Sequence, residues 1–383
     1  MSQRQHVVCF QQRLTHYREV FFQRSKDRLS EREIGFSLVH GAPDAVARGK
    51  RDGGRLPWAH QVDTVAVNIG GARGVWVPMA KGIPLPDMVI VTQENKLLAN
   101  YAWLLRRQFG SVKVAFWGHG RNFQTGAPNG LRERWKKLLV GRVDWWFAYT
   151  RMTRDILLGD GYPDERITIL DNAIDNEAFQ ADLASITASD LIALRAKVGA
   201  GETAPVGLFC GSLYPEKRID FLIEAADRIR AAIPDFVLVV VGDGPGVAEV
   251  TAAMGSRPWL HWAGVQKGRE KAAWFKLASV VLNPGLVGLH ILDSFCSGVP
   301  LVTTADALHS PEIAYLENGV NGLLVEGDVS SYAQIVIDLL LDGQALGRLR
   351  VGALGSARRY TLDNMVETFA DGISRCLAVE KKP

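Results

Sequence analysis

Short apolar, β-branched runs alternate with longer amphipathic stretches along most of the chain, and this alternation limits the folds that it can adopt. The first four runs lie at 7–10, 35–39, 88–92 and 112–117. A second set begins near 206 and continues to 325, and apolar periodicity predicts helices at 17–29 and 95–109. Because strands that alternate with helices form parallel sheets covered on both faces, the pattern predicts an α/β protein.

The length of the chain predicts two domains. At 383 residues it exceeds what one hydrophobic core usually organises. A cluster of glycine, proline and polar residues interrupts the alternating pattern between 185 and 203. We therefore expect one domain at 1–190 and a second at 200–360.

A glycine-bearing loop between a strand and a helix is the most informative local motif. The apolar run 278–282 predicts a buried strand, and Gly285 and Gly288 let the following backbone turn and approach a ligand closely. Leucine and phenylalanine then recur at helical spacing until Gly298 ends the helix. The alternative interpretation is an ordinary tight connection between a strand and a helix.

The start of this helix is predicted to hold a diphosphate. Its first amides have no partner within the helix and lie at the positive end of the helix dipole. These donors belong to Val287, Gly288 and Leu289. Asp293 lies about one turn into the helix, where it would accept hydrogen bonds from ribose hydroxyls.

A second element of the same kind lies upstream. The apolar run 206–210 is followed by a loop with Lys217 and Arg218, which are candidate phosphate cations, and then by an amphipathic helix. A further buried run ends in the turn 242–245, at the carboxyl end of a strand, where α/β sheets bind ligands. Val247 stands where a dinucleotide fingerprint requires glycine, which disfavours an NAD oxidoreductase.

In this order, the motifs resemble the C-terminal half of the family 4 glycosyltransferases, which take a sugar from a nucleotide diphosphate sugar. The resemblance covers nearly the whole chain and implies the GT-B fold, in which two Rossmann-like β/α/β domains face each other across a cleft. The first domain would take the acceptor and the second the nucleotide-sugar donor. The resemblance also implies that a final helix, within about 361–383, returns to the first domain.

Individual family motifs can be placed on this chain. A Gly-Arg-Leu loop followed by a lysine corresponds to 211–213 with Lys217, and two glutamates eight positions apart correspond to Gly285 and Asp293. His119 lies between two glycines where the family has a histidine close to the donor sugar. The resemblance therefore implies that His119 and Lys217 are the catalytic residues.

Three positions depart from the family pattern, and all three concern the donor. Ser212 replaces the arginine that braces the diphosphate, Gly285 replaces the first glutamate, and Asp293 shortens the second. Arg218 would then supply the missing cation at the diphosphate. Sugar recognition would use backbone amides near Gly285 or another polar side chain, for which the candidates are His290, His309 and Glu312. An inactive homologue that only binds the nucleotide sugar is the alternative.

The implied reaction is a substitution at the anomeric carbon, in which the charge of the departing nucleoside diphosphate must be stabilised. The family mostly retains the anomeric configuration. An inverting enzyme would need a general base, with His16, Glu94 or His119 as candidates. Because the chain has no Asp-x-Asp pair or ligand cluster, no metal or other cofactor is expected. A nonhydrolysing nucleotide-sugar epimerase shares the architecture, but its pair of catalytic carboxylates cannot be placed.

The acceptor is expected to be a carbohydrate, a lipid-linked compound or a small molecule, in the synthesis of a polysaccharide, a glycoconjugate or a glycosylated metabolite. The residues expected on the acceptor side are His16, Arg18, Glu94 and Arg121. Two basic and aromatic segments, 17–29 and 132–147, would suit an anionic membrane face. The alternative is that both are amphipathic and bury their apolar sides in the core.

Composition agrees with a cytoplasmic enzyme, which would work at the inner face of the membrane if these segments bind it. The four cysteines have neither metal-ligand nor disulfide spacing, which predicts reduced packing residues. There is no signal-peptide pattern, and no apolar run approaches the roughly 20 residues of a membrane span. A net charge of +3, from 44 basic and 41 acidic residues, does not support nucleic-acid binding.

Overall fold

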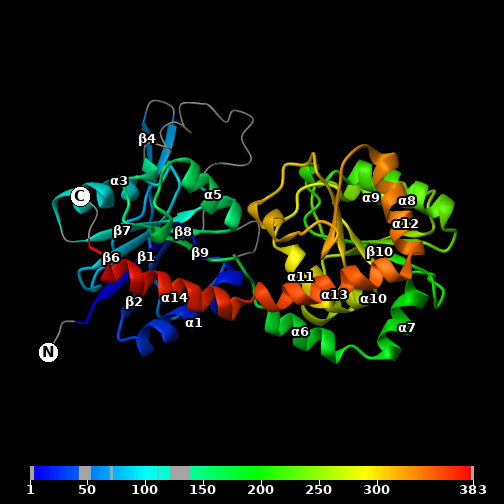
Figure 1. Ribbon diagram of the computed structural model, residues 1–383, viewed down its shortest axis with the longest axis horizontal. Coiled ribbons are helices and arrows are strands. Elements are labelled where there is room, and N and C mark those ends of the chain that lie inside the picture. The colour runs from blue at the N-terminus through cyan, green and yellow to red at the C-terminus, as the bar shows by residue number, and fades with distance from the viewer. Residues whose placement is uncertain (1–3, 43–52, 70–71, 111, 121–138, 381–383) are drawn as a thin grey trace. The chain divides into compact units, whose positions relative to one another are not determined.

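The computed structural model describes residues 4–42, 53–69, 72–110, 112–120 and 139–380. The chain divides into two compact units (Figure 1). Unit 1 consists of Met1–Ile174 and Leu362–Pro383, and unit 2 consists of Asp175–Thr361. Each unit is built on its own parallel sheet with helices packed against it, so the α/β prediction is confirmed.

Unit 1 contains a parallel sheet with the strand order β3-β2-β1-β6-β7-β8-β9. Its strands are β1 (His6–Gln11), β2 (Gly35–Gly41), β3 (His60–Val62), β6 (Met88–Thr92), β7 (Lys113–Gly118), β8 (Trp145–Ala148) and β9 (Ile167–Ile169). A separate antiparallel hairpin pairs β4 (Val65–Ile69) with β5 (Ala72–Trp76). Apart from the edge strand β3, the sheet strands are largely buried on both faces, which explains why they read as continuous apolar runs in the sequence.

Four longer helices accompany this sheet within the described part of unit 1. They are α1 (Glu19–Glu31), α3 (Leu98–Phe109), α5 (Arg151–Gly159) and α14 (Leu362–Ala378). The last of these packs on α1, β8 and β9. Its fully buried Phe369 lies against the rings of Phe21, Trp117 and Phe147, at centroid distances of 5.3, 5.6 and 5.0 Å. The C-terminal segment thus completes the core of unit 1.

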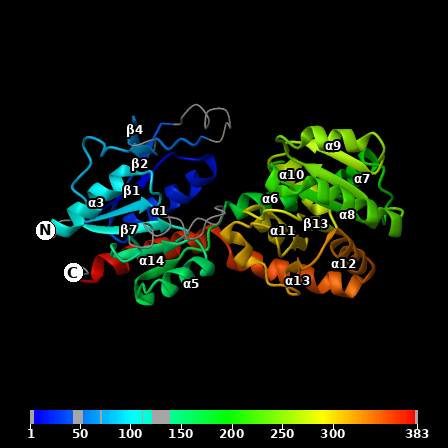
Figure 2. The ribbon, with the colours of Figure 1, turned by 90° about the horizontal axis from the view of Figure 1, so that it is seen from above.

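Unit 2 contains a parallel sheet with the strand order β12-β11-β10-β13-β14-β15. Its strands are β10 (Val206–Cys210), β11 (Val237–Val241), β12 (Leu260–Gly264), β13 (Val280–Leu282), β14 (Leu301–Thr304) and β15 (Gly322–Val325). Its helices are α6 (Asn176–Ser185), α7 (Ala188–Lys197), α8 (Ile219–Ala232), α9 (Val247–Met254), α10 (Gly268–Leu277), α11 (His290–Ser297), α12 (Val329–Leu341) and α13 (Gly343–Arg359). Figure 2 shows helices on both faces of this sheet.

The boundary between the units differs from the expected one. The chain changes unit after Ile174, not between 185 and 203. Helices α6 and α7 pack on α10 and α11 of unit 2, where the ring of Phe179 meets that of Phe275 edge-on at 5.6 Å. The glycine and proline cluster at 199–205 therefore marks only the turn from α7 into β10.

The order of the strands fixes where a ligand can approach each sheet. From β10 the chain continues outward to β11 and β12, whereas β13, β14 and β15 extend in the opposite direction. The strand order thus reverses at β10 and β13, and in open α/β sheets ligands bind in the crevice outside the carboxyl ends of such strands, here called the β10/β13 crevice. In unit 1 the corresponding position lies between β1 and β6.

The expected membrane-binding segment at 132–147 is not supported where it is described. Residues 132–138 lie outside the described residues, as does Arg121. Trp145, Trp146 and Phe147 form the buried strand β8 and are at most 1 % exposed. These aromatic residues belong to the core of unit 1, so they cannot contact a membrane.

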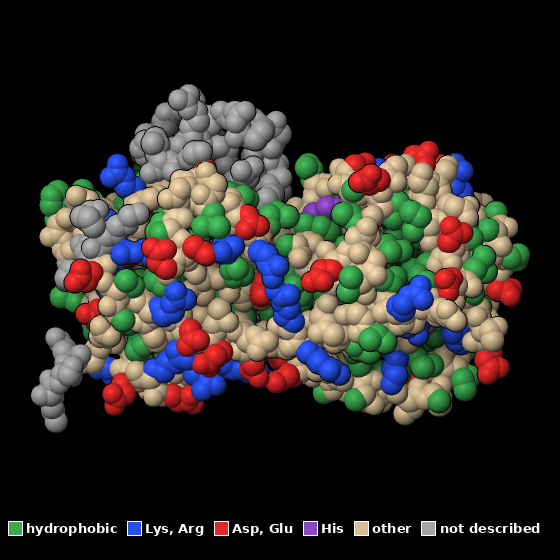
Figure 3. All heavy atoms as spheres, in the orientation of Figure 1, with side chains coloured by type: hydrophobic (Ala, Val, Ile, Leu, Met, Phe, Trp, Pro, Cys, Tyr) green, Lys and Arg blue, Asp and Glu red, His purple; other side chains and the backbone are tan. Residues whose placement is uncertain are grey.

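The basic side of α1 is also partnered. Arg24 pairs with Asp363 of α14, and Arg28 pairs with Glu367 of the same helix at 2.8 Å. Arg32, which follows α1, bonds both Glu367 and Asp371. Figure 3 shows basic and acidic side chains interspersed on the face in view. In the described ranges, no helix is both long and apolar enough to cross a bilayer.

Candidate functional site

In unit 2, the loop after β13 packs directly on the turn after β10. The turn is the 3-10 helix η3 (Pro215–Lys217). The amide of Leu286 donates to the carbonyl oxygen of Glu216 at 2.8 Å, and the Nζ of Lys217 donates to the carbonyl oxygen of Leu286. Asn283 Nδ2 donates to the same carbonyl oxygen at 3.0 Å. The two phosphate-type motifs of the sequence are therefore one continuous site at the β10/β13 crevice.

Gly285 is required by this close packing. A Cβ atom at this position would lie 2.2 Å from the carbonyl oxygen of Glu216 and 2.6 Å from the Cα of Lys217. These neighbours are backbone atoms, which cannot rotate away as a side chain can. The carboxylate that the family has here is thus replaced by contact between two backbone segments.

Lys217 lies at the centre of the site and is only 8 % exposed. Burial lowers the pKa of its ammonium group to about 8. Among the described residues no carboxylate lies in salt-bridge range of this ammonium group, whose hydrogen-bond acceptor is the carbonyl oxygen of Leu286. A buried cation with a neutral partner retains donors for an anionic ligand.

Arg218, which the sequence predicts as the second cation at the diphosphate, forms an ion pair in the structure. Its guanidinium bonds Asp306 at 2.9 Å and the hydroxyl of Thr304 at 3.1 Å, and lies 4.5 Å from the ring centroid of Phe221. Its backbone is left-handed, with φ of 56°. Ser212 is exposed and adds no charge. The arginine is thus paired with an acidic side chain, whereas Lys217 has a carbonyl oxygen as its acceptor, and the role of Arg218 at the diphosphate stays a prediction.

The start of α11 offers fewer amides than the sequence predicted. The amide of Val287 donates to Nδ1 of His309 at 3.2 Å, so it is already used. The backbone amides of Gly288 and Leu289 have no hydrogen-bond acceptor in the described part of the chain. Two of the three predicted amides therefore remain as donors for a phosphate.

His309 holds the loop in place and is not open to a sugar. Its Nδ1 accepts from Val287, and its Nε2 donates to the carbonyl oxygen of Thr304 at 2.7 Å. Together these bonds require the neutral Nε2–H tautomer. Burial lowers the pKa of His309, which agrees with a neutral ring. Both ring nitrogens of His309 are therefore already bonded, and its role at the donor sugar stays a prediction.

His290 and Glu312 are the remaining candidates for the donor sugar. His290 begins α11, and its buried Nε2 has no hydrogen-bond partner within the part of the chain that is described. Burial lowers the pKa of His290 well below its usual value, and the charges of Lys217 and Lys271 add to this effect. Glu312 is 5 % exposed and lies in the 3-10 helix η4 (Pro311–Tyr315).

Asp293 forms an ion pair that the sequence did not predict. Both of its carboxylate oxygens accept from Nζ of Lys271 on α10, at 2.9 and 3.0 Å. The carboxylate is nearly buried, and this burial raises its pKa while Lys271 lowers it. Lys271 precedes Trp274 and Phe275 by one helical turn, so it lies on the buried stripe of α10. A basic residue on an apolar stripe was the signal in the sequence.

In unit 1, His119 and Arg18 come together around Tyr149 at the carboxyl ends of the strands. The ring of His119 stacks on that of Tyr149 at 4.1 Å, and the guanidinium of Arg18 lies 5.8 Å from the same ring. Arg18 is 7 % exposed and donates to Asn172 Oδ1 at 2.7 Å. His16 is exposed beside them in the sequence. The ends of β1, β7 and β8 therefore supply one polar and aromatic cluster.

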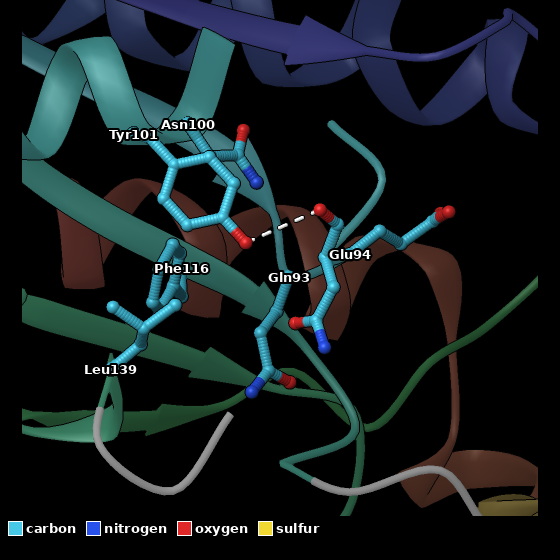
Figure 4. A pocket seen from close by; sticks show the side chains of 7 residues that line it. Gln93, Glu94, Asn100, Tyr101, Phe116 and Leu139 are labelled. Carbon is cyan, nitrogen blue, oxygen red and sulfur yellow. Dashed lines mark hydrogen bonds between the residues drawn. The ribbon is translucent and has the colours of Figure 1, made fainter. Parts of the chain in front are cut away.

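Glu94 lies at a small pocket after β6 (Figure 4). Its carboxylate pairs with Lys96 at 2.9 Å. The Tyr101 hydroxyl donates to the carbonyl oxygen of Asn95 at 3.2 Å, and the ring of Phe116 lies beside Tyr101. The free volume of about 10 Å³ is room for about one water molecule. This pocket is too small for a sugar acceptor.

Known proteins resemble the chain in sequence and in fold. Residues 204–342 match the family described as "Glycosyl transferases group 1". A D-inositol 3-phosphate glycosyltransferase of Stackebrandtia nassauensis is 29 % identical over 231 residues, which are 55 % of this chain and 50 % of that protein. The alpha-monoglucosyldiacylglycerol synthase of Acholeplasma laidlawii is 23 % identical over 203 residues, or 51 % of this chain and 50 % of that one. The chain thus spans about half the length of such curated relatives.

Solved structures agree over nearly the whole chain. HepE of Anabaena, solved in complex with UDP, superposes with a TM-score of 0.69 at 16 % identity and covers 97 % of this chain and 99 % of its own. A glycosyltransferase of Rickettsia africae gives a TM-score of 0.70 at 12 % identity, covering 99 % and 100 %. The chain therefore has the GT-B fold, and its residues 204–342 are similar to the group 1 glycosyltransferases.

Proposed function

We propose that the protein transfers a sugar from a nucleoside diphosphate sugar to an acceptor hydroxyl. The observation that carries the proposal is the β10/β13 crevice of unit 2. There the buried ammonium of Lys217, with only a carbonyl oxygen as acceptor, lies in one site with the amides of Gly288 and Leu289. A cation and helix-start amides are the groups that a diphosphate needs.

In the proposed reaction, the bond between the anomeric carbon and the diphosphate oxygen breaks, and the acceptor oxygen forms the new bond. The electron pair leaves with the diphosphate. Negative charge therefore grows on the diphosphate oxygen, next to Lys217 and the amides, as the reaction proceeds. Loss of one such preorganised donor costs about 3–4 kcal/mol of barrier. The acceptor proton passes to the leaving phosphate in the retaining mechanism that we propose, and no metal is part of it.

We also propose roles for two further clusters, one in each unit. Asp293 would accept hydrogen bonds from the ribose, as its position one turn into α11 suggests. His119 and Arg18, which share Tyr149, would serve the donor sugar and the acceptor. By their names, one relative glycosylates an inositol 3-phosphate and the other makes a monoglucosyldiacylglycerol, so we propose a hydroxyl compound as acceptor without choosing between a polar and a lipid one.

The test has a binding arm and a transfer arm. Thermal shift and calorimetry with UDP, GDP and ADP and their sugars should identify one nucleoside diphosphate that stabilises the protein. With that donor, Lys217→Ala should reduce turnover about a hundredfold or more while the fold persists.

Lys276→Ala is a matched control, because Lys276 bonds the carbonyl oxygens of Leu183 and Ile186 away from the site. Equal turnover in Lys217→Ala and the parent protein would contradict the proposal. Binding without transfer or donor hydrolysis would instead identify an inactive homologue.

A further inference from the structure

The ion pair between α10 and α11 lies beside the site and is not explained by the diphosphate chemistry. Asp293 is 5 % exposed, and both oxygens of its carboxylate accept hydrogen bonds from Nζ of Lys271, at 2.9 and 3.0 Å. The Lys271 ammonium group also lies 4.7 Å from the ring centroid of Phe179 on α6. The lysine is thus held in one place by a carboxylate and an aromatic ring, each from a different helix.

Among the described residues, Lys271 is the one cation that favours the charged form of the Asp293 carboxyl group. Lys271 is the charged group that lowers the pKa of Asp293, whereas burial raises it. The neighbouring thiols are Cys210 on β10 and Cys296 on α11, and both are uncharged at neutral pH because burial raises their pKa values to about 12 and about 11. From α6, Asn176 and Gln180 reach Cys296 with neutral amide groups.

We propose that Lys271 is a positioning residue for recognition of the nucleotide ribose, because it keeps the shortened carboxylate of Asp293 ionised and fixed in orientation. This inference rests on the proposed function. A carboxylate carries more acceptor positions than one ammonium group occupies, so the pair can still accept from a ribose hydroxyl. Without the lysine, a nearly buried carboxylate would take up a proton and lose its fixed orientation.

The experiment compares binding of a ribonucleotide with that of its deoxy form. The probe is whichever of UDP, GDP and ADP stabilises the parent protein most, together with its 2′-deoxy analogue, titrated by calorimetry between about pH 6 and about pH 8. The parent protein should prefer the ribonucleotide by about tenfold or more, as expected for a hydrogen bond to a charged group. Lys271→Met should reduce this preference to about twofold or less, and Lys271→Arg should restore most of it.

The pH dependence separates positioning from a general loss of structure. In Lys271→Met the pKa of Asp293 rises, so more of the carboxyl group is protonated at the lower end of the range. The preference for the ribonucleotide over its 2′-deoxy form should therefore increase with pH in this variant, because the titration of Lys217 affects both ligands alike. A variant that had merely lost stability would weaken both ligands equally.

Two further variants keep the test decisive. Lys276 lies on the same helix as Lys271 and also makes two hydrogen bonds. Lys276→Met should leave the preference for the ribonucleotide unchanged. If Lys271→Met does not fold, the double variant Lys271→Met/Asp293→Asn removes the unpaired buried charge and should still lack the preference. A full ribose preference in Lys271→Met or in the double variant would overturn the inference. If no nucleoside diphosphate binds the parent protein, the proposed function itself fails.

Discussion

Replacement of Gly285 by alanine tests whether two backbone segments must touch to form the donor site. The added Cβ would lie 2.2 Å from the carbonyl oxygen of Glu216, whereas ordinary contacts begin at 3.4 Å. The loop and the turn must therefore separate by about 1 Å, and the hydrogen bond from Leu286 to Glu216 must lengthen or break. Because Lys217 follows Glu216 directly, its ammonium group moves with the turn.

The expected loss can be estimated from these contacts. Overpacking costs about 1–3 kcal/mol and a lost hydrogen bond about 1 kcal/mol, so unfolding free energy should fall by about 2–4 kcal/mol. For a unit of this size, that loss lowers the melting temperature by about 5–15 °C. A shift of about 1 Å in a group that positions the reaction can reduce turnover about a hundredfold. Gly285→Glu should lose at least as much, although it restores the family's carboxylate.

Differential scanning calorimetry and transfer kinetics measure the two effects. Gly355→Ala on α13 is the matched control, since no atom lies within 4 Å of its added Cβ. It should leave turnover unchanged and raise stability by up to about 1 kcal/mol. If Gly285→Ala melts within about 1 °C of the parent protein and transfers sugar at the same rate, the packing argument is refuted. A gain of activity in Gly285→Glu would show that the missing carboxylate limits the enzyme.

Three other predictions concern the charged and polar groups. Because burial lowers the pKa of Lys217 to about 8, nucleoside diphosphate affinity in calorimetry should fall as pH rises through that value, and a flat profile would count against the assignment. Arg107→Met leaves Asp144, which is 3 % exposed, without its ion-pair partner, and should cost unit 1 about 3–5 kcal/mol in urea unfolding. The exposed Arg106→Met is its control, and equal losses would contradict the argument. His309→Ala should destabilise unit 2 by about 1–3 kcal/mol and weaken diphosphate binding. Unchanged binding would show that the hydrogen bond between Val287 and His309 is not needed for the diphosphate.

The sequence was most predictive where structure is decided locally. The run at 206–210 became β10, and the glycine loop and helix after 282 became the approach to α11, because strand burial and helix periodicity are visible within one element. The boundary at Ile174 was missed because α6 looks like any amphipathic helix. Only its packing on α10 and α11 assigns it to unit 2.

The chemistry of the site was predicted less completely, for a physical reason. Whether the amide of Val287 is available depends on His309, which lies 22 residues away. The state of Asp293 depends in the same way on Lys271, from a different helix. Spacing within one motif cannot reveal which donors a distant side chain has already used. As expected, His119 follows the end of β7 and Lys217 lies between β10 and α8, and the roles of both residues remain predictions.

The path of the chain through α14 has a consequence for biosynthesis. Phe369 fills the centre of an aromatic cluster in unit 1, yet it is translated after all of unit 2. Until then, the faces of Phe21, Trp117 and Phe147 that it covers have no permanent neighbour. A ribosome therefore releases a unit 2 able to fold at once, while the earlier half of the protein waits with an apolar surface that chaperones can recognise.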